Sequence, residues 1–354
     1  MAIQSAFTLT PNEIYESLAN MIISQEVFAD NLGKHQTLVD KARVDGGLFG
    51  DTKLYYSTDV LESHDWLNDE EAGNLLALDR PKDPEVQAIK LDVFRQIRLT
   101  LDNYMTKRAF ADEGTFASFN GVMLGWMKDT KKVYDGTLYN VFIGTTVAEG
   151  AGQSRKIDLS DAASNEDEAK LIAQGIADLM VEMGDYSREF NDYGNLRSYA
   201  DESIDIIWNA KWVNKIRKVD LPAIFHKEGL MDKFEQEQLP ARYFGTVIAN
   251  AHTAVAGERS VVEKDYTVSN VVKHVFPGDE IPVGASVDAG EAYTVDEKVI
   301  CKVVVKLPPY MSAFEVGTTF FNARSLTENH YLTFGHNSLA YLKNYPFITV
   351  SKEA

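Results

Sequence analysis

The longest hydrophobic pattern in the chain runs from Thr115 to Ile143. Its apolar residues return every three or four positions, a spacing that places them on one side of a helix: Phe116, Phe119, Met123, Trp126, Val133 and Val141. At about 1.5 Å per residue such a helix would be roughly 40 Å long, which exceeds most helices of globular proteins. Three internal glycines each cost about 1 kcal/mol in a helix. We therefore predict a long spine helix over residues 115–143 that is held by packing.

A pattern of a different period precedes this helix. Aliphatic residues alternate with polar ones over thirteen positions, interrupted only at Phe94 and Arg95: Ile89, Leu91, Val93, Ile97, Leu99 and Leu101. Period two over this length predicts a β-strand of roughly 40 Å, about twice the mean. The run Leu54–Thr58 predicts a partner strand, and a polar tip containing Asp69–Glu71 separates the two.

Two extended runs joined by a long polar tip predict a β-hairpin that projects from the body of the protein. An isolated two-stranded hairpin is only marginally stable in water, so its apolar face needs a neighbour. The pattern of residues 46–105 therefore indicates assembly with other subunits.

The remaining patterns predict shorter elements. Residues 1–45 contain one helical pattern, Pro11–Met21, and too little apolar surface for a core, so we expect an arm. We expect a second amphipathic helix over 166–184 and a helix over 210–216 that Asn209 caps. In the run 299–307 apolar residues alternate with Lys302 and Lys306, which predicts a strand with one face in water. The other predicted strands cover 203–208, 243–248, 271–276 and 347–350.

Composition narrows the range of functions. The formal net charge is −18, with 53 acidic and 35 basic residues. This charge argues against binding to nucleic acid or to an anionic membrane, because phosphate contacts require clustered Lys and Arg. We also find no signal peptide and no apolar run of about 18 residues, and so expect a chain that stays in the cytoplasm where it is made. The single cysteine, Cys301, excludes an intrachain disulfide and a Cys-rich zinc site.

Candidate catalytic chemistry is sparse. None of the GxSxG, HExxH, GxGxxG or P-loop patterns occurs, and Gly33-Lys34 is followed by His35 instead of Ser or Thr. His330 and His336 come closest to a metal pair, but surface or packing roles are more common for such histidines. We interpret Cys301 as a packing residue and the acids at 166–168 as complementing a helix dipole. We therefore expect a structural protein with no enzyme activity, cofactor or metal.

The succession of arm, long hairpin, spine helix, second helix and strand-Asn-helix (SIDIIWNAKWVNKI, 203–216) resembles the major capsid proteins of tailed bacteriophages, which have the Hong Kong 97-type fold. The resemblance covers nearly the whole chain in element order, without a short invariant motif. It implies an α+β fold divided as follows: 1–45 N-terminal arm, 46–105 extended β-hairpin loop, 106–200 peripheral domain with the spine helix, 201–298 mixed α/β axial domain, and 299–354 return to the peripheral domain and tail.

The resemblance also implies a function. Such a protein self-assembles into hexamers and pentamers of an icosahedral shell that encloses double-stranded DNA without binding it specifically, and it resides in the virion. A separate scaffolding protein, a portal and decoration proteins are implied partners. Two alternatives stay open: an encapsulin-like compartment shell, which shares the fold, and a soluble acidic enzyme with a lid at 46–102.

The hairpin is the predicted contact between subunits, lying over the spine helix of a neighbour. We expect the alternating aliphatic face to be buried there, and Arg80, Arg95 and Arg98 to form ion pairs across the contact. The full set of predicted interface residues is Ile89, Leu91, Val93, Arg95, Ile97, Arg98, Leu99, Leu101, Tyr55, Tyr56 and Arg80.

Overall fold

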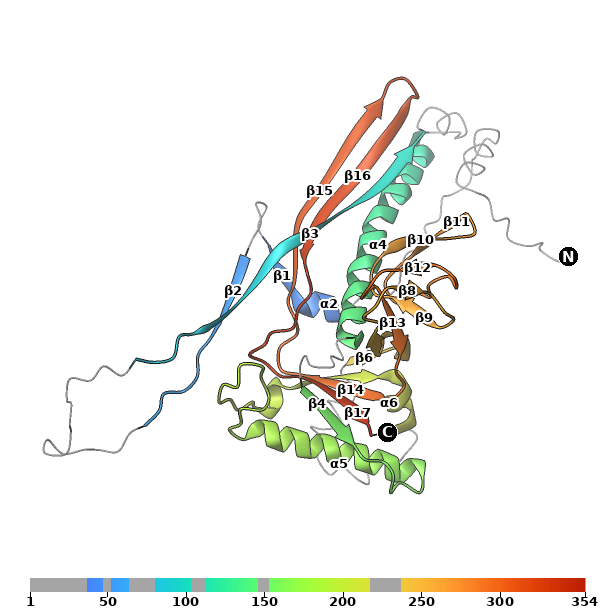
Figure 1. Cartoon of the computed structure of the whole chain (residues 1–354). Coiled ribbons are helices and arrows are strands. Elements are labelled where there is room, and N and C mark those ends of the chain that lie inside the picture. Colours follow the sequence, from blue (N-terminus) through green and yellow to red (C-terminus); the bar gives the residue numbers. More distant parts are fainter. Residues whose placement is uncertain are drawn as a thin grey trace, which may run out of the picture.

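The computed structural model describes residues 37–46, 52–63, 80–102, 113–145, 153–216 and 237–353. The predicted helix at 11–21 and the acidic tip at 69–71 lie outside these ranges. Within them the protein is an elongated α+β molecule, with a long helix beside one sheet, a second sheet below it and a small β domain at its side (Figure 1).

The spine helix is α4, Glu113–Thr145, and it extends the predicted helix by two residues at each end. Met123, Met127 and Tyr134 are buried on the side that faces the sheet, and the last turns are buried almost all round. Gly144 permits this close packing, because a Cβ atom there would lie 2.0 Å from the Tyr243 carbonyl oxygen. The prediction of a packed spine helix is confirmed.

A five-stranded sheet lies along α4 in the order β1-β15-β16-β3-β2. β1 is parallel to β15 and the other pairs are antiparallel. The predicted hairpin of β2 and β3 is present, whereas the long β15–β16 hairpin was not predicted. The strands are β1 (Arg43–Asp45), β2 (Thr52–Ser57), β3 (Glu85–Leu101), β15 (Tyr310–Asn322) and β16 (Thr327–Asn337), and the short helix α2 (Thr37–Ala42) leads into β1.

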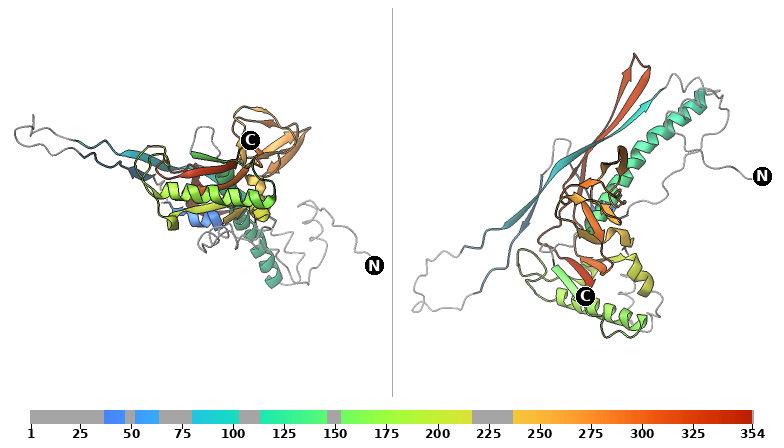
Figure 2. Two further views of the ribbon diagram at one scale, coloured as in Figure 1. Left: turned by 90° about the horizontal axis from the view of Figure 1, so that it is seen from below. Right: turned by 45° about the vertical axis from the view of Figure 1, so that its right-hand side comes forward.

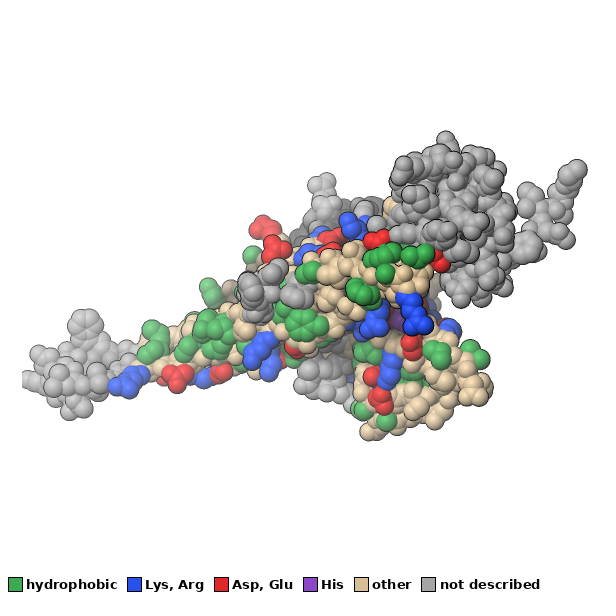
Figure 3. Space-filling model, turned by 90° about the horizontal axis from the view of Figure 1, so that it is seen from above, with side chains coloured by type: hydrophobic (Ala, Val, Ile, Leu, Met, Phe, Trp, Pro, Cys, Tyr) green, Lys and Arg blue, Asp and Glu red, His purple; other side chains and the backbone are tan. Residues whose placement is uncertain are grey.

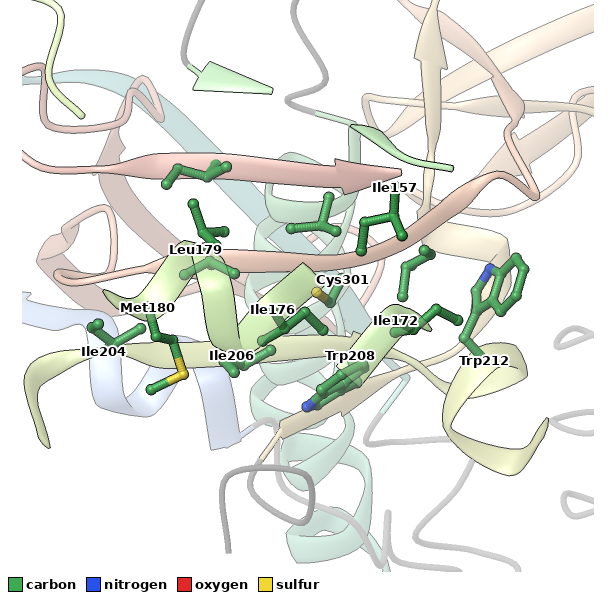
Figure 4. Close-up of a cluster of buried hydrophobic side chains, with 14 of the residues drawn as sticks. Ile157, Ile172, Ile176, Leu179, Met180, Ile204, Ile206, Trp208, Trp212 and Cys301 are labelled. Carbon is green, nitrogen blue, oxygen red and sulfur yellow. The ribbon is translucent and has the colours of Figure 1, made fainter. Parts of the chain in front are cut away.

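A second five-stranded sheet has the order β4-β17-β14-β5-β6. The second predicted helix, α5 (Asn165–Gly184), packs on one face of this sheet, and Figure 4 shows hydrophobic side chains buried between them. Asn209 accepts a hydrogen bond from the Lys211 amide at 3.1 Å, so it caps α6 (Ala210–Ile216) as predicted. The strands are β4 (Gln153–Ile157), β5 (Asp205–Asn209), β6 (Glu237–Leu239), β14 (Val299–Val304) and β17 (Phe347–Lys352).

The small β domain is inserted between β6 and β14 and has a core of its own, which includes Ala254, Tyr266, Val275, Ile281 and Ala285. Its sheets have the orders β7-β13-β9, β10-β11 and β12-β8. The strands are β7 (Gly245–Val247), β8 (His252–Thr253), β9 (Glu258–Ser260), β10 (Lys264–Val268), β11 (Val271–Val275), β12 (Ser286–Val287) and β13 (Ala292–Val295).

The second sheet joins three of the predicted ranges, two of which the sequence assigned to the peripheral domain and one to the axial domain. Its core contains Ile172 of α5, Ile206 of β5 and Val303 of β14, from the ranges 106–200, 201–298 and 299–354. The boundaries predicted at residues 200 and 298 therefore do not separate independent hydrophobic cores.

The prediction that the strand at 299–307 has a wet face is wrong. All six residues of β14 are buried, because β5 and β17 flank the strand and clusters of apolar side chains cover both faces. Lys302 is completely buried, and its Nζ donates to the Thr349 hydroxyl at 2.7 Å. Burial disfavours the charged ammonium group and lowers the pKa of Lys302 to about 7.

This burial predicts a pH-dependent stability. The pKa of Lys302 is about 7 in the folded protein, against about 10.4 in an unfolded chain, so the unfolded state binds more protons between these values. Folding stability should therefore rise with pH from about 7 to about 10, by at most about 1.4 kcal/mol per pH unit. Relative to Lys302→Met, the wild-type free energy of unfolding should rise over this window in denaturant titrations. Parallel pH profiles would contradict this, and the exposed Lys306→Met variant should follow the wild type.

A buried polar cluster joins α4 to the first sheet. The Asp135 carboxylate accepts hydrogen bonds from Lys131 Nζ on the same helix at 2.8 Å and from the Tyr310 hydroxyl of β15 at 2.6 Å. Arg43 Nη2 of β1 lies 3.4 Å from it. The adjacent residue on the helix, Tyr134, places its hydroxyl 2.7 Å from His336 Nε2 of β16. This cluster ties the helix to three strands.

Asp135→Asn should destabilise the folded subunit by about 3 kcal/mol, because it removes the buried counter-charge 2.8 Å from Lys131 Nζ and leaves only the half-exposed Glu315 carboxylate, at 3.7 Å. Equilibrium denaturation by urea measures this difference. The matched control is Asp129→Asn on the same helix, where the carboxylate is partly exposed and 3.7 Å from Lys132 Nζ; its effect should stay below about 1 kcal/mol. Equal effects of the two substitutions would contradict the assigned role of Asp135.

Candidate subunit interface

The β2–β3 hairpin forms a ribbon that leaves the body of the protein (Figures 1 and 2). Residues 91–101 of β3 pair with β16, whereas residues 85–90 continue past the end of β16 and pair with β2. The thirteen alternating residues at 89–101 therefore lie mainly within the sheet of the subunit, and the projecting part is formed by β2 and the first third of β3.

The odd-numbered face of β3 turns toward the spine helix of the same subunit. Ile89 and Leu101 are only 4% and 3% exposed, so they have almost no surface left for a neighbour. The predicted interface role of these two residues is therefore corrected: their burial is completed within the chain. The other predicted aliphatic residues on this face, Leu91, Val93, Ile97 and Leu99, are half-buried. Their contact with a second subunit stays a prediction.

The even-numbered face of the ribbon is the exposed apolar one. Four large hydrophobic side chains on it are between 48% and 64% exposed: Leu54, Tyr56, Val86 and Phe94. Tyr56 lies directly opposite Val86 in the β2–β3 register, and period two places Phe94 on the same face further along β3. We call these four residues the outer face. Figure 3 shows hydrophobic side chains along the projecting ribbon.

The three predicted interface arginines have different surroundings. Arg95 points toward α4 and forms an ion pair with Glu263 of the same chain at 2.8 Å, with its guanidinium 4.9 Å from the centre of the Tyr134 ring. The prediction that Arg95 pairs across subunits is therefore corrected. Arg98 is exposed and donates to Gln96 Oε1 at 3.1 Å, and Arg80 is exposed. Both remain available to a neighbouring molecule.

The two predicted tyrosines also differ. Tyr55 is half-buried on the inner side of the ribbon, with Lys306 Nζ 5.4 Å from its ring centre. Burial raises its pKa above the usual range. Tyr56, the next residue, points outward and is 64% exposed. Of these two adjacent tyrosines, only Tyr56 therefore belongs to the outer face.

A clasp of hydrogen bonds fixes the end of β2 to the loop that follows α5. Ser57 is buried between the side chains of Asn195 and Asn344, at 2.6 and 2.5 Å. The Asp59 carboxylate accepts from Arg188 and from the Leu196 amide. These hydrogen bonds hold the pKa of Asp59 well below its usual range, and the bond from Arg188 has the largest effect. Sequence reasoning missed this clasp, because the two residues that each bond joins are 129 to 287 residues apart and no local pattern marks them.

Asp59→Ala should loosen the base of the ribbon without unfolding the subunit, since the Asp59 and Arg188 side chains are partly exposed. Backbone amides of residues 52–58 should then exchange with solvent several-fold faster in hydrogen–deuterium exchange, while those of α5 keep their wild-type rates. Asp161→Ala, at an exposed acid outside the clasp, serves as the control. Unchanged exchange in the Asp59 variant would rule out the clasp as the anchor of the ribbon.

The residues considered for chemistry are scattered through the structure, and His330 places its Nε2 3.7 Å from Glu328 Oε1. His336 is buried and donates from Nδ1 to the Asn337 carbonyl at 2.9 Å, so its Nε2 accepts from Tyr134. Burial lowers its pKa. Cys301 is fully buried, which raises the pKa of its thiol. The acids at 166–168 lie in the first turn of α5, where Ser164 accepts from the Asp167 amide.

Metal clusters and membrane-spanning helices are both absent from the described ranges. In that part of the chain, no group of three or more His, Cys, Asp or Glu side chains is arranged to hold a metal ion. None of its helices combines the length and the apolar character needed to span a membrane.

Comparison with known proteins gives similarity in fold alone. No protein-family model matches the sequence, and no curated protein matches it. The structure is similar to a chain in the capsid structure of Staphylococcus phage Andhra, with a TM-score of 0.65 and 10% identity, covering 100% of this chain and 90% of that one.

A second similar chain occurs in the structure of the head fiber and inner core protein gp22 of native bacteriophage P68, with a TM-score of 0.61 and 12% identity, covering 98% and 91% of the two chains. Both likenesses extend over essentially the full length of the protein. The chain therefore has the Hong Kong 97-type fold of tailed-bacteriophage capsid proteins.

Proposed function

We propose that this protein is the major capsid protein of a tailed bacteriophage, and that its copies form hexamers and pentamers of an icosahedral shell around double-stranded DNA. The observation that carries the proposal is the likeness over the whole chain to a chain of the phage Andhra capsid structure. The virion is then its location, and a scaffolding protein, a portal and decoration proteins are its expected partners.

The projecting ribbon supplies a physical reason for assembly. Its outer face exposes Leu54, Tyr56, Val86 and Phe94 to water in the single subunit. Burying one large apolar side chain contributes about 1.5 to 3 kcal/mol. A neighbour that covers these four side chains would gain most of the free energy of one contact, and a closed shell repeats that contact in every copy.

Charged residues around the outer face would add specificity more than affinity. Lys90, Arg98 and Arg80 are exposed on or beside the ribbon. In a chain of net charge −18 they can meet acidic surfaces of a second copy. Exposed ion pairs of this kind contribute about 0 to 1 kcal/mol each, so they would select the position of the neighbour.

The acidic balance fits a wall that confines DNA without adhering to it. Phosphates and carboxylates repel one another, so the packed genome would not adhere to a shell of such subunits and could exit from it. A strongly basic inner surface in the assembled shell would contradict this part of the proposal.

Two other functions are distinguished by direct experiment. Gel filtration and negative-stain microscopy of the purified protein should yield capsomers, sheets or closed particles, whereas an enzyme with a lid should run as a small oligomer. An encapsulin-like compartment would also form particles, but these would enclose an enzyme instead of DNA. Particles isolated from an infected host and filled with DNA support the capsid function, and protein-filled particles from an uninfected host would exclude it.

Tyr56→Asp should reduce the yield of particles by roughly tenfold or more, because one buried charge in each contact costs over 1.4 kcal/mol. The subunit should remain folded, since this side chain is exposed. Circular dichroism measures folding, and particle counts in negative stain measure assembly. The matched control is Tyr186→Asp, a comparably exposed tyrosine after α5. Normal particles from the Tyr56 variant would refute the role of the outer face.

A further inference from the structure

One end of the small β domain exposes valines in a way that the ribbon does not explain. Val255, Val271 and Val283 are each more than half exposed, and Val271 reaches 67%. They come from three segments: the loop after β8, the start of β11 and the loop before β12. A patch of apolar side chains gathered from separate segments marks an interaction site more often than a single exposed valine does.

Backbone contacts bring these segments together. The Gly284 amide donates to the Ala254 carbonyl at 2.9 Å, and the Ala254 amide donates to the Ala285 carbonyl at 2.8 Å, so Val255 and Val283 lie on two segments that are hydrogen-bonded to each other. Val268 packs on the core of the domain, and its Cγ1 lies 3.8 Å from the position of a Cβ on Gly284.

Val271 pairs directly with Val268, which places it on the same face of the β10–β11 hairpin. We call Val255, Val268, Val271 and Val283 the valine cap. Figure 1 shows the hairpin and the β8–β12 pair side by side in this domain.

The hairpin holds its part of the cap in a fixed position. Its turn consists of Ser269 and Asn270, which both have positive φ angles, 50° and 65°. Two such residues between paired strands form the tight turn that matches the twist of a hairpin. The cap is therefore ordered before it meets a partner, which reduces the entropy lost on binding.

The cap is also free of charge in a strongly acidic protein. The segments 253–257, 267–272 and 281–287 contain no Asp, Glu, Lys or Arg, although charged residues make up 25% of the chain. The flanking Glu258 is buried and bonded to His252 at 2.9 Å, and Lys273 is exposed beside the cap. Two copies that each carry a net charge of −18 repel one another, and they can approach most closely where neither is charged.

We propose that the valine cap packs against the valine cap of a second copy, related by a local two-fold axis. A self-complementary apolar patch without charge fits this isologous contact, in which the same residues meet from both sides. The inference rests on the proposed function, because a capsid brings many copies of the chain together. It concerns a contact that does not involve the ribbon. It assigns the small domain a role in linking subunits.

Single-cysteine crosslinking tests this contact. The only native cysteine, Cys301, is fully buried and does not compete. Val255→Cys, Val271→Cys and Val283→Cys are prepared separately in the full-length chain, and assembled and unassembled fractions are treated with a mild oxidant or a short bismaleimide. At least one variant should give covalent dimers on a non-reducing gel, because residues near a two-fold axis lie close to their own copies.

Two controls make the result specific. Val272→Cys lies on the same hairpin but on its opposite face, next to Thr267 in the register, and Val181→Cys lies on α5. Both side chains are exposed, and neither variant should crosslink above background. Dimers from the cap variants alone support the inference. The absence of dimers from all three cap variants, or equal dimers from the controls, would overturn it.

The experiment also separates this inference from the proposed function. Particle formation by the wild-type protein, seen in negative stain, tests the capsid function and does not involve the crosslink. Crosslinks to a different protein in an infected-cell extract, without homodimers, would show that the cap serves another partner and would overturn the two-fold contact while leaving the capsid function intact.

Discussion

The position of the spine helix against the first sheet depends on one buried carboxylate. Asp135 lies in the middle of the contact and accepts hydrogen bonds from Lys131 of its own helix and Tyr310 of β15. A buried charge is costly unless its partners are placed correctly, so this cluster tolerates only one arrangement of helix and strands. The neighbouring Tyr134–His336 contact and the Arg95–Glu263 ion pair extend the constraint to β16, β3 and the small domain.

The direction of the ribbon follows from that arrangement. β3 is held along residues 91–101 by β16, and its first residues continue in the same line beyond the body, with the clasp at Ser57 and Asp59 fixing β2. The buried polar contacts of the subunit thus stabilise a rigid frame, while apolar side chains of the ribbon remain exposed to water. Such a division is costly for a solitary protein and favourable for one whose copies cover each other's surfaces.

The elements with long regular patterns could be predicted from the sequence, because their burial follows their own period. α4, α5 and β3 are of this kind. The β16 strand was missed because Phe334, Gly335, His336 and Asn337 are buried consecutively, and the polar ones are satisfied by distant partners such as Tyr134 and the Met311 amide. Lys302 was misread for the same reason, since its burial is imposed by β5 and β17.

The projecting hairpin was predicted correctly, but the exposed apolar residues of the ribbon lie on the face opposite to the predicted one. Alternation identifies an apolar side of β3, yet it does not say whether a helix of the same chain covers that side. The spine helix does so at Arg95, and the exposed apolar residues lie on the other face, where Tyr56 and Phe94 interrupt a polar pattern.

A density map of the assembled protein, obtained by electron cryomicroscopy, would show directly whether neighbouring subunits cover the ribbon. The account predicts that the outer face of each ribbon is covered by an adjacent subunit, with Tyr56 and Phe94 excluded from solvent. A shell in which these side chains remain in water, or a purified protein that forms no shell at all, would contradict it.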